Sequence, residues 1–259
     1  MLDVEFAQFS DIGRVRQHNE DFLGFTVPAT PAEARSHGWL FALADGVGGH
    51  EAGEVASRTA VESMIEGFRK GLAGELLPGL LRRLVQNANE RVYSAGRSMS
   101  TTIVACALRF DRAVVAHVGD SRCYLIRGGE AAQLTRDHTI VNEQIRLGVL
   151  STGEAASAAT RHLLSRSLGS DLFVNVEIGE QPVRPGDVLV LCSDGLHASV
   201  EPADMATALR ERANLETAAR ELTALANERD GRDNISVQLI RVRAIERMGI
   251  YRGRPYKLR

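Results

Sequence analysis

The sequence predicts an α+β fold in which sheets are covered by pairs of helices. Three nearly continuous apolar runs predict strands that are buried on both faces: Trp39–Ala44, Ala113–Val118 and Val188–Cys192. The candidate strands fall in blocks, and the candidate helices come mostly in pairs. The regular alternation of a parallel βαβ series is missing, which favours layered sheets flanked by helices.

Shorter segments complete this pattern. Further strands are expected at Val4–Phe9, Phe22–Val27, Thr102–Leu108, Cys123–Arg127, Val174–Ile178 and Ile235–Val242. Helices are expected at 52–70, 75–95, 201–211 and 214–228. In the second of these, apolar residues recur at three- and four-residue steps, which predicts a core-facing stripe. That stripe is Leu77, Leu80, Leu81, Leu84, Ala88 and Val92.

Composition excludes several classes of protein. The 259 residues suit one large domain or two small ones, and a net charge of −2 gives no electrostatic case for nucleic acid. The N-terminus lacks a basic segment, and no apolar run approaches the ~20 residues that span a bilayer. Three widely spaced cysteines, Cys106, Cys123 and Cys192, indicate reduced core thiols. We therefore expect a cytoplasmic protein with no membrane segment.

Two segments differ from the rest of the chain. Residues 137–169 mix a short amphipathic piece with Gly, Ser, Thr and Ala, which indicates an excursion from the sheet, a flap. Residues 244–259 contain five basic residues against Glu246. This tail is either a frayed, solvated end or a weak docking segment for an acidic partner.

Four aspartates lie at the ends of candidate strands: Asp45, Asp120, Asp194 and Asp233. Converging carboxylates repel one another unless a cation lies among them, and oxygen ligands select Mg²⁺, Mn²⁺ or Ca²⁺. A glycine follows Asp45 and Asp194 and would let the backbone turn sharply beside a metal. One such Asp-Gly pair alone is typical of a plain turn, but the set favours a metal site.

A polar cluster runs from Arg16 to Asp21. The planar fork of an arginine suits a pair of phosphate oxygens. Glu20 and Asp21 add acceptors for metal-bound waters. Taken alone, the cluster would be better explained as a charged turn before a strand.

Six motifs in the same order resemble the metal-dependent protein phosphatase (PPM) family, and its bacterial serine/threonine branch most closely. They are RQHNED (16–21), ADGVGGHEAGEVAS (44–57), VGDSRCYL (118–125), LLSRSLG (163–169), CSDGL (192–196) and RDNISV (232–237). The likeness covers about residues 4–243. It implies a phosphatase domain at 1–243, with a flap at about 137–169, and a basic tail at 244–259.

The resemblance implies a four-layer αββα sandwich of two antiparallel sheets flanked by helix pairs, with two Mn²⁺ or Mg²⁺ ions and a weaker third. By this likeness Asp45 bridges the two ions, the Gly46 carbonyl binds one, and Asp194 and Asp233 complete the other. Asp120 would hold the third ion together with Asp194.

The same likeness assigns the remaining roles. Glu20 and Asp21 would hold metal-bound waters, and Arg16 would grip the substrate phosphate. The implied reaction is hydrolysis of phosphoserine and phosphothreonine by a metal-bound hydroxide. The implied partners are phosphorylated proteins and a cognate serine/threonine kinase, which the enzyme opposes in signalling. We expect a monomer.

The sequence departs from the family pattern at two places. Ser100 stands where the family has glycine, and Val47 stands where some members carry a histidine that is a proposed general acid. His50 is nearby in a different register, so the general acid is not assigned. Cys192 lacks the arginine-rich loop of cysteine phosphatases and is expected in the core.

Three alternatives share the fold or its ions. They are a non-catalytic relative that has lost the metals, a phosphoesterase of small molecules or nucleotides, and a regulatory phosphatase of a sigma-factor partner-switching system. The presence of Asp45, Asp194 and Asp233 disfavours a non-catalytic relative. A substrate screen is needed to distinguish a phosphoesterase of small molecules. Partner-switching phosphatases usually carry appended sensor domains, which this sequence does not show.

Overall fold

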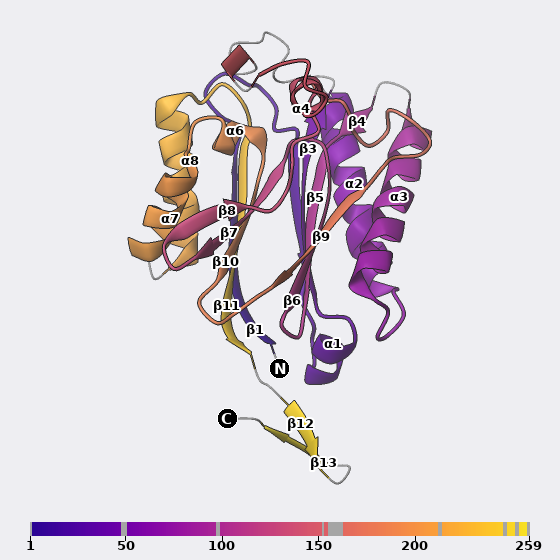
Figure 1. The fold of residues 1–259 in the computed structure, drawn as a ribbon. Coiled ribbons are helices and arrows are strands. Elements are labelled where there is room, and N and C mark those ends of the chain that lie inside the picture. The colour runs from indigo at the N-terminus through magenta and orange to yellow at the C-terminus, as the bar shows by residue number, and fades with distance from the viewer. Residues whose placement is uncertain are drawn as a thin grey trace.

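The computed structural model describes residues 2–47, 51–96, 99–151, 153–154, 163–211, 214–245, 248–251 and 254–257. Two sheets lie face to face, and helices cover the outer face of each (Figure 1). Every strand pair among these residues is antiparallel. The expected αββα sandwich is confirmed.

The first sheet has five strands. Their order is β1 (Leu2–Asp11), β11 (Ile235–Ile245), β10 (Val188–Cys192), β7 (Arg122–Arg127) and β8 (Glu130–Gln133). Helices α7 (Pro202–Glu211) and α8 (Leu215–Arg229) cover its outer face (Figure 1). Strands β1 and β11 are the first and last strands of the two large sheets, and they lie side by side in the first sheet.

The second sheet has the order β2 (Asp21–Thr26), β3 (Trp39–Val47), β5 (Ile103–Arg109), β6 (Arg112–Val118) and β9 (Glu177–Pro182), with β4 (Ser100–Thr101) paired to β3. Helices α2 (Glu51–Arg69) and α3 (Leu77–Ala95) cover it. Helices α1 (Pro31–Ser36), α4 (Ile140–Arg146) and α6 (Asp194–His197) are short and lie in connections.

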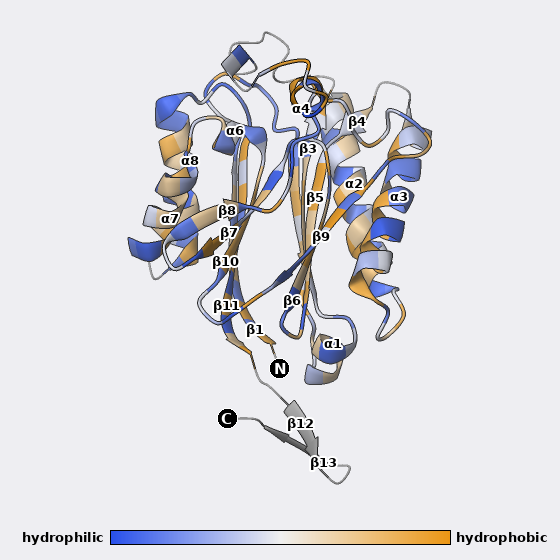
Figure 2. Ribbon diagram, in the orientation of Figure 1, coloured by the Kyte–Doolittle hydropathy of each residue, from blue (hydrophilic) through white to orange (hydrophobic). Residues whose placement is uncertain are grey.

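Three layers of apolar side chains hold these four layers together. Phe41, Leu43 and Leu189 lie between the sheets, and the predicted leucine stripe of α3 packs against the second sheet. Figure 2 shows apolar residues along the strands and the inner helix faces, with hydrophilic residues outward. Each fully buried large side chain contributes about 1.5–3 kcal/mol, so burial dominates the stability of the sandwich.

All three cysteines are buried and free, as expected. Burial raises the pKa of the Cys192 thiol to about 12. A thiol this hard to ionise is a poor nucleophile. Cys192 is a core residue of β10.

One strand begins later than predicted. The segment Val174–Ile178 was expected as a strand, but β9 starts at Glu177. Val174 and Val176 pack into the α3 layer, and the Val176 carbonyl accepts a hydrogen bond from Arg82 Nη1 at 3.2 Å. Their apolar character reflects burial against a helix, which a strand pattern does not distinguish.

The C-terminal segment also differs from expectation. Strand β11 continues to Ile245, two residues past the expected domain end, and Met248–Tyr251 (β12) pairs with Arg254–Lys257 (β13) in a hairpin. A frayed tail is therefore wrong for these residues. In the expected flap, the amphipathic piece is helix α4, and residues 152 and 155–162 lie outside the described part of the chain.

Candidate metal centre

The predicted site residues come from the same end of both sheets, the upper end in Figure 1. Asp21 begins β2 and lies opposite Asp45 on β3. Asp194 begins helix α6 directly after β10, and Asp233 lies just before β11. Asp120 lies between β6 and β7. The two sheets thus bring together carboxylates that are far apart in the sequence.

These carboxylates interact strongly. Burial raises the pKa of Asp45 well above its usual range, and the charges of Asp21, Asp194, Asp120 and Asp233 raise it further. Like charges that are held together out of water favour protonation unless a cation neutralises them. Asp45 therefore lies within electrostatic reach of the other four carboxylates of the cluster.

Asp21 shows that the cluster suits a cation. Its Oδ2 accepts a hydrogen bond from Ser193 Oγ at 2.8 Å, while its buried Oδ1 has no partner among the described residues. Burial raises the pKa of Asp21 to about 7, and Asp194 and Asp233 add to the shift. A buried oxygen without a hydrogen bond is costly. A hard cation, or water bound to one, would satisfy it.

The backbone beside the cluster leaves no room for larger residues. A Cβ on Gly46 would lie 2.2 Å from the Gly53 carbonyl oxygen and 2.8 Å from that of Glu20. A Cβ on Gly53 would lie 2.6 Å from Glu20 Oε2. Both positions require glycine, because the start of α2 packs directly against β3 and Glu20 there. The oxygen-only set of donors and this close backbone fit a site for Mg²⁺ or Mn²⁺.

Arg16 lies on the rim of the cluster. Its Nη2 donates to Asp233 Oδ2 at 2.7 Å, and both side chains are partly exposed. The hydrogen bond to Asp233 raises the pKa of Arg16, and the charges of Glu20 and Asp45 contribute. The guanidinium therefore faces the carboxylates from the solvent side.

Asp120 also belongs to the cluster. It is buried, and desolvation raises its pKa to about 7, with further contributions from Asp194 and Asp137. Its carbonyl oxygen accepts a hydrogen bond from His197 Nε2 at 3.0 Å. Asp137, at the start of the expected flap, pairs with Arg122 through two contacts of 2.9 and 2.7 Å. The flap therefore begins beside Asp120.

Sequence reasoning missed the residue that fastens the Arg16–Asp21 loop. Asn234 Nδ2 donates to the carbonyl oxygens of Ile12 and His18, each at 2.9 Å. Asn234 Oδ1 accepts from the Glu20 backbone at 2.8 Å. This amide clamps the loop against Asp233. The sequence feature that could have revealed Asn234 is its position in the RDNISV motif, between the expected ligand Asp233 and a buried strand.

The oxygen ligands gain further support from hydroxyl groups. Thr102 Oγ1 accepts a hydrogen bond from the Asp45 backbone at 3.0 Å, and Thr101 Oγ1 donates to the Asp45 carbonyl at 2.7 Å. These contacts hold the end of β3 in place. Ser100 pairs with Val47 across β3 and β4, so its replacement of the family glycine leaves this pairing intact.

No general acid emerges from the described residues. Val47 is 37% exposed and has no ionisable group. His50 lies outside the described residues.

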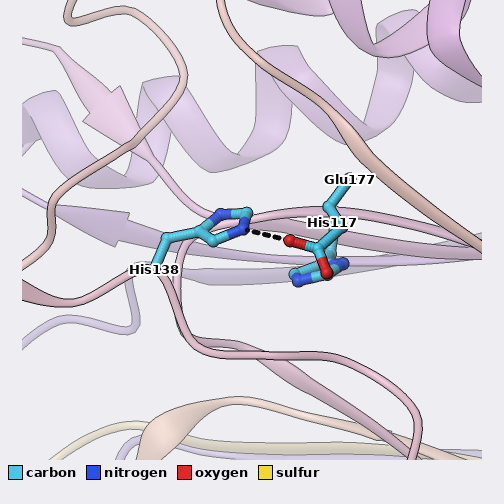
Figure 3. Close-up of side chains that lie close together, drawn as sticks. All are labelled: His117, His138 and Glu177. Carbon is cyan, nitrogen blue, oxygen red and sulfur yellow. Dashed lines mark hydrogen bonds and ion pairs between the residues drawn. The ribbon is translucent and has the colours of Figure 1, made fainter. Parts of the chain in front are cut away.

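A second group of side chains contacts Gly119, the residue before Asp120. His117, His138 and Glu177 have ligand atoms within 4.8 Å of one another (Figure 3). His138 Nδ1 accepts from the Gly119 backbone at 3.2 Å, so its Nε2 carries the proton and donates to Glu177 Oε2 at 3.2 Å. The ring of His117 stacks on that of His138 at 4.7 Å. The nitrogen atoms of His138 are thus both engaged in hydrogen bonds, and the group forms a His–Glu brace between β6, β9 and the flap.

The carboxylate cluster at one end of an αββα sandwich defines a metal-dependent phosphatase class. The chain belongs to the protein phosphatase 2C family, whose profile matches residues 14–234. It is 35% identical to the serine/threonine phosphatase stp of Listeria monocytogenes over 248 residues, covering 92% of this chain and 95% of that one. It is 31% identical to the protein phosphatase PhpP of Streptococcus pneumoniae over 245 residues, covering 92% and 97%.

Solved structures show the same fold. A serine/threonine phosphatase of S. agalactiae matches with a TM-score of 0.85 and 35% identity, covering 93% of this chain and 100% of that one. The catalytic domain of PstP, in complex with two manganese ions, matches with a TM-score of 0.79 and 32% identity, covering 94% and 100%. Among the described helices, none has the length and apolarity needed to cross a bilayer.

Proposed function

We propose that the carboxylate cluster is the catalytic centre of a Mn²⁺- or Mg²⁺-dependent serine/threonine protein phosphatase. The observation that carries this proposal is the convergence of Asp21, Asp45, Asp194 and Asp233, in which the charges of Asp194 and Asp233 help to raise the pKa of both Asp21 and Asp45. The family membership and the serine/threonine phosphatases among the relatives support it.

The residues have separate roles in this proposal. Asp45 would hold both ions, the Gly46 carbonyl would bind one of them, and Asp194 and Asp233 would bind the other. Glu20 and Asp21 hold water molecules on the ions. Asp120 contributes to a weaker third site with Asp194, to which its charge is coupled.

When bound by these residues, two ions would supply an acidified water as nucleophile and would neutralise charge on the phosphoryl oxygens. Arg16 positions the substrate. It uses Nη2 for Asp233, and an arginine has five N–H donors, so others remain for two phosphate oxygens. Orientation of the phosphorus toward the attacking oxygen is a large part of such catalysis.

The proposed substrates are phosphorylated proteins, and the biological partner is a serine/threonine kinase whose products this enzyme hydrolyses. We further propose that the chain acts as a monomer in the cytoplasm, with residues 1–243 as the phosphatase domain and 244–259 as an appended basic segment.

The test is hydrolysis of phosphoserine and phosphothreonine peptides with Mn²⁺, with Mg²⁺ and with chelator. Nucleotides and small phosphomonoesters serve as controls. Metal-dependent turnover with a higher kcat/KM for peptides than for nucleotides supports the proposal. A preference for nucleotides would instead indicate a phosphoesterase of small molecules, and equal activity in chelator would exclude the two-ion centre.

A further inference from the structure

Four arginines line one hollow beneath the flap helix α4, with a volume of about 490 Å³. They come from three regions: Arg82 from α3, Arg136 from the residue just before the flap, and Arg146 and Arg166 from the flap itself. The remaining lining residues are Asn175, Val176, Glu177 and Ile178. The hollow is therefore strongly basic on a protein whose net charge is −2.

The carboxylates that face these arginines are too few to balance them. Arg146 Nε and Arg166 Nη2 share Glu143, at 2.8 and 3.0 Å. Arg136 Nη2 pairs with Glu177 at 2.9 Å, and Arg82 Nη1 donates to the Val176 carbonyl. Among these residues, four guanidinium groups face two carboxylates. The surplus of two positive charges would balance the negative charge of a phosphate monoester, which is about −1.5 to −2 at pH 7.

The arginines converge on one space. The hydrogen bond from Arg146 lowers the pKa of Glu143, and the charges of Arg166 and Arg136 also lower it. Three of the four arginines thus lie within electrostatic reach of one carboxylate. Each has further N–H donors beyond the contacts above, in the planar arrangement that binds phosphate oxygens in pairs.

The hollow is accessible to a macromolecule. The side chains of Arg136 and Arg146 are 53% and 54% exposed. A phosphorylated side chain would reach them without opening the core.

The hollow is connected to the carboxylate cluster by the His–Glu brace (Figure 3). Glu177, which lines the hollow, accepts from His138, and His138 accepts from Gly119, the neighbour of Asp120. Two hydrogen bonds and one imidazole ring therefore join Glu177 of the hollow to Gly119, the residue before Asp120. The inference requires a peptide that runs from the cluster along this connection to the hollow, and an extended chain spans about 3.3–3.6 Å per residue.

We propose that this arginine hollow binds a second phosphoryl group of the substrate protein while the first lies at the carboxylate cluster. The preferred substrates are then proteins phosphorylated at two neighbouring residues. This inference rests on the proposed function, because it concerns how that site selects its substrate.

The experiment compares peptides with one phosphothreonine against peptides with a second, placed two to six residues away. We expect kcat/KM for the best doubly phosphorylated peptide to be about 10-fold higher, mainly through KM, as one charge-assisted contact would give. Arg146→Gln and Arg82→Gln should each reduce this preference severalfold and leave the singly phosphorylated peptide unchanged. Arg220→Gln is the matched control, because Arg220 forms an exposed helix-surface ion pair with Glu216 away from the hollow.

Several outcomes separate the possibilities. Equal kcat/KM for all peptides in the wild type, or an unchanged preference in both hollow variants, overturns the inference. If glutamate replaces the second phosphothreonine without loss, the hollow selects acidic peptides and the phosphoryl assignment is wrong. If inorganic phosphate binds the hollow in calorimetry while the doubly phosphorylated peptide gains nothing, the site serves free phosphate, which also contradicts the inference.

Failure of the proposed function has a different signature. In that case the singly phosphorylated peptide is not hydrolysed at all. Fluorescence anisotropy with the same labelled peptides then tests the hollow directly. Tighter binding of the doubly phosphorylated peptide, lost in Arg146→Gln, upholds the inference, and equal binding of both peptides refutes it.

Discussion

Asp21 lies directly opposite Asp45 across the antiparallel pair β2 and β3. Like charges in directly opposed positions destabilise a sheet, and here burial raises the pKa of both carboxyl groups. The fold therefore holds an arrangement that is unfavourable for the protein alone and favourable with a cation. This relationship links stability, metal binding and catalysis.

The first prediction follows from that repulsion. Asp45→Asn should make the chelated protein more stable than the chelated wild type, because it removes a buried like charge. The rise in Tm on adding Mn²⁺ should shrink, because an ion that binds the folded protein more weakly stabilises it less. Turnover should fall at least ~10²-fold, the scale of losing one stabilising group. Thermal melts with Mn²⁺ and with chelator check this, and an unchanged Mn²⁺ shift would refute it.

The second prediction separates Arg16 from the ligands. Arg16→Ala should weaken catalysis but not Mn²⁺ affinity, because its partly exposed ion pair with Asp233 contributes little and removing it leaves Asp233 free for the ion. Arg16→Lys should restore only part of the activity, since lysine lacks the planar fork. Calorimetry of Mn²⁺ binding and peptide kinetics are the measurements. A large loss of Mn²⁺ affinity in Arg16→Ala would show that the role is misassigned.

The third prediction concerns Asp120. Desolvation and Asp194 raise the pKa of this buried carboxyl, so Asp120→Ala should not reduce the Tm. Two tight Mn²⁺ sites should remain, because Asp45, Asp194 and Asp233 are unchanged, while turnover falls and excess Mn²⁺ does not fully restore it. Collapse of the fold would instead assign Asp120 a structural role. Full turnover at saturating Mn²⁺ would remove it from the catalytic site.

The fourth prediction concerns the clamp of Asn234. Asn234→Ala removes its bonds to Ile12, His18 and Glu20, and should cost about 2–4 kcal/mol, at roughly 1 kcal/mol or more for each buried group left unpaired. Turnover should fall as well, since Arg16 is on the same loop. The control is Asn214→Ala, the N-cap of α8, which should cost ~1 kcal/mol and leave turnover unchanged. Urea unfolding with peptide kinetics compares the two, and equal effects would contradict the clamp.

The fifth prediction is a pH dependence of stability from His138. Burial lowers the pKa of His138 to about 4, below its value near 6.5 in the unfolded chain. The unfolded state therefore binds a proton more readily between these values. The contribution to stability is complete above pH ~6.5 and is lost as the pH falls toward 4, with a slope of up to ~1.4 kcal/mol per pH unit.

Urea unfolding of the chelated wild type and of His138→Gln at several pH values measures that slope. The variant should have the shallower dependence, because glutamine does not titrate. His117→Gln should act in the same direction, since burial also lowers the pKa of His117. Identical pH dependence in all three proteins would exclude the brace as its source.

Local patterns in the sequence were enough to predict most helices and strands. The apolar runs of β3, β6 and β10 are short and nearly continuous, which favours buried strands, and the leucine stripe of α3 recurs at three- and four-residue steps, which favours a helix. Val174 and Val176 show where this fails, because an apolar residue records burial and not the partner that buries it. The short α1 was also missed, although Thr30 caps it and Pro31 begins it.

The aspartates at strand ends could likewise be named from the sequence, since a carboxylate after a buried run and before a glycine is unusual. Their mutual placement could not. The alignment of Asp21 with Asp45, the contact of Arg16 with Asp233 across 217 positions and the clamp of Asn234 depend on the register of strands and the packing of two sheets. Those are long-range contacts, and no local period encodes them. The same holds for the arginine hollow, whose four side chains become one site only when α3, the flap and the segment before β9 pack together.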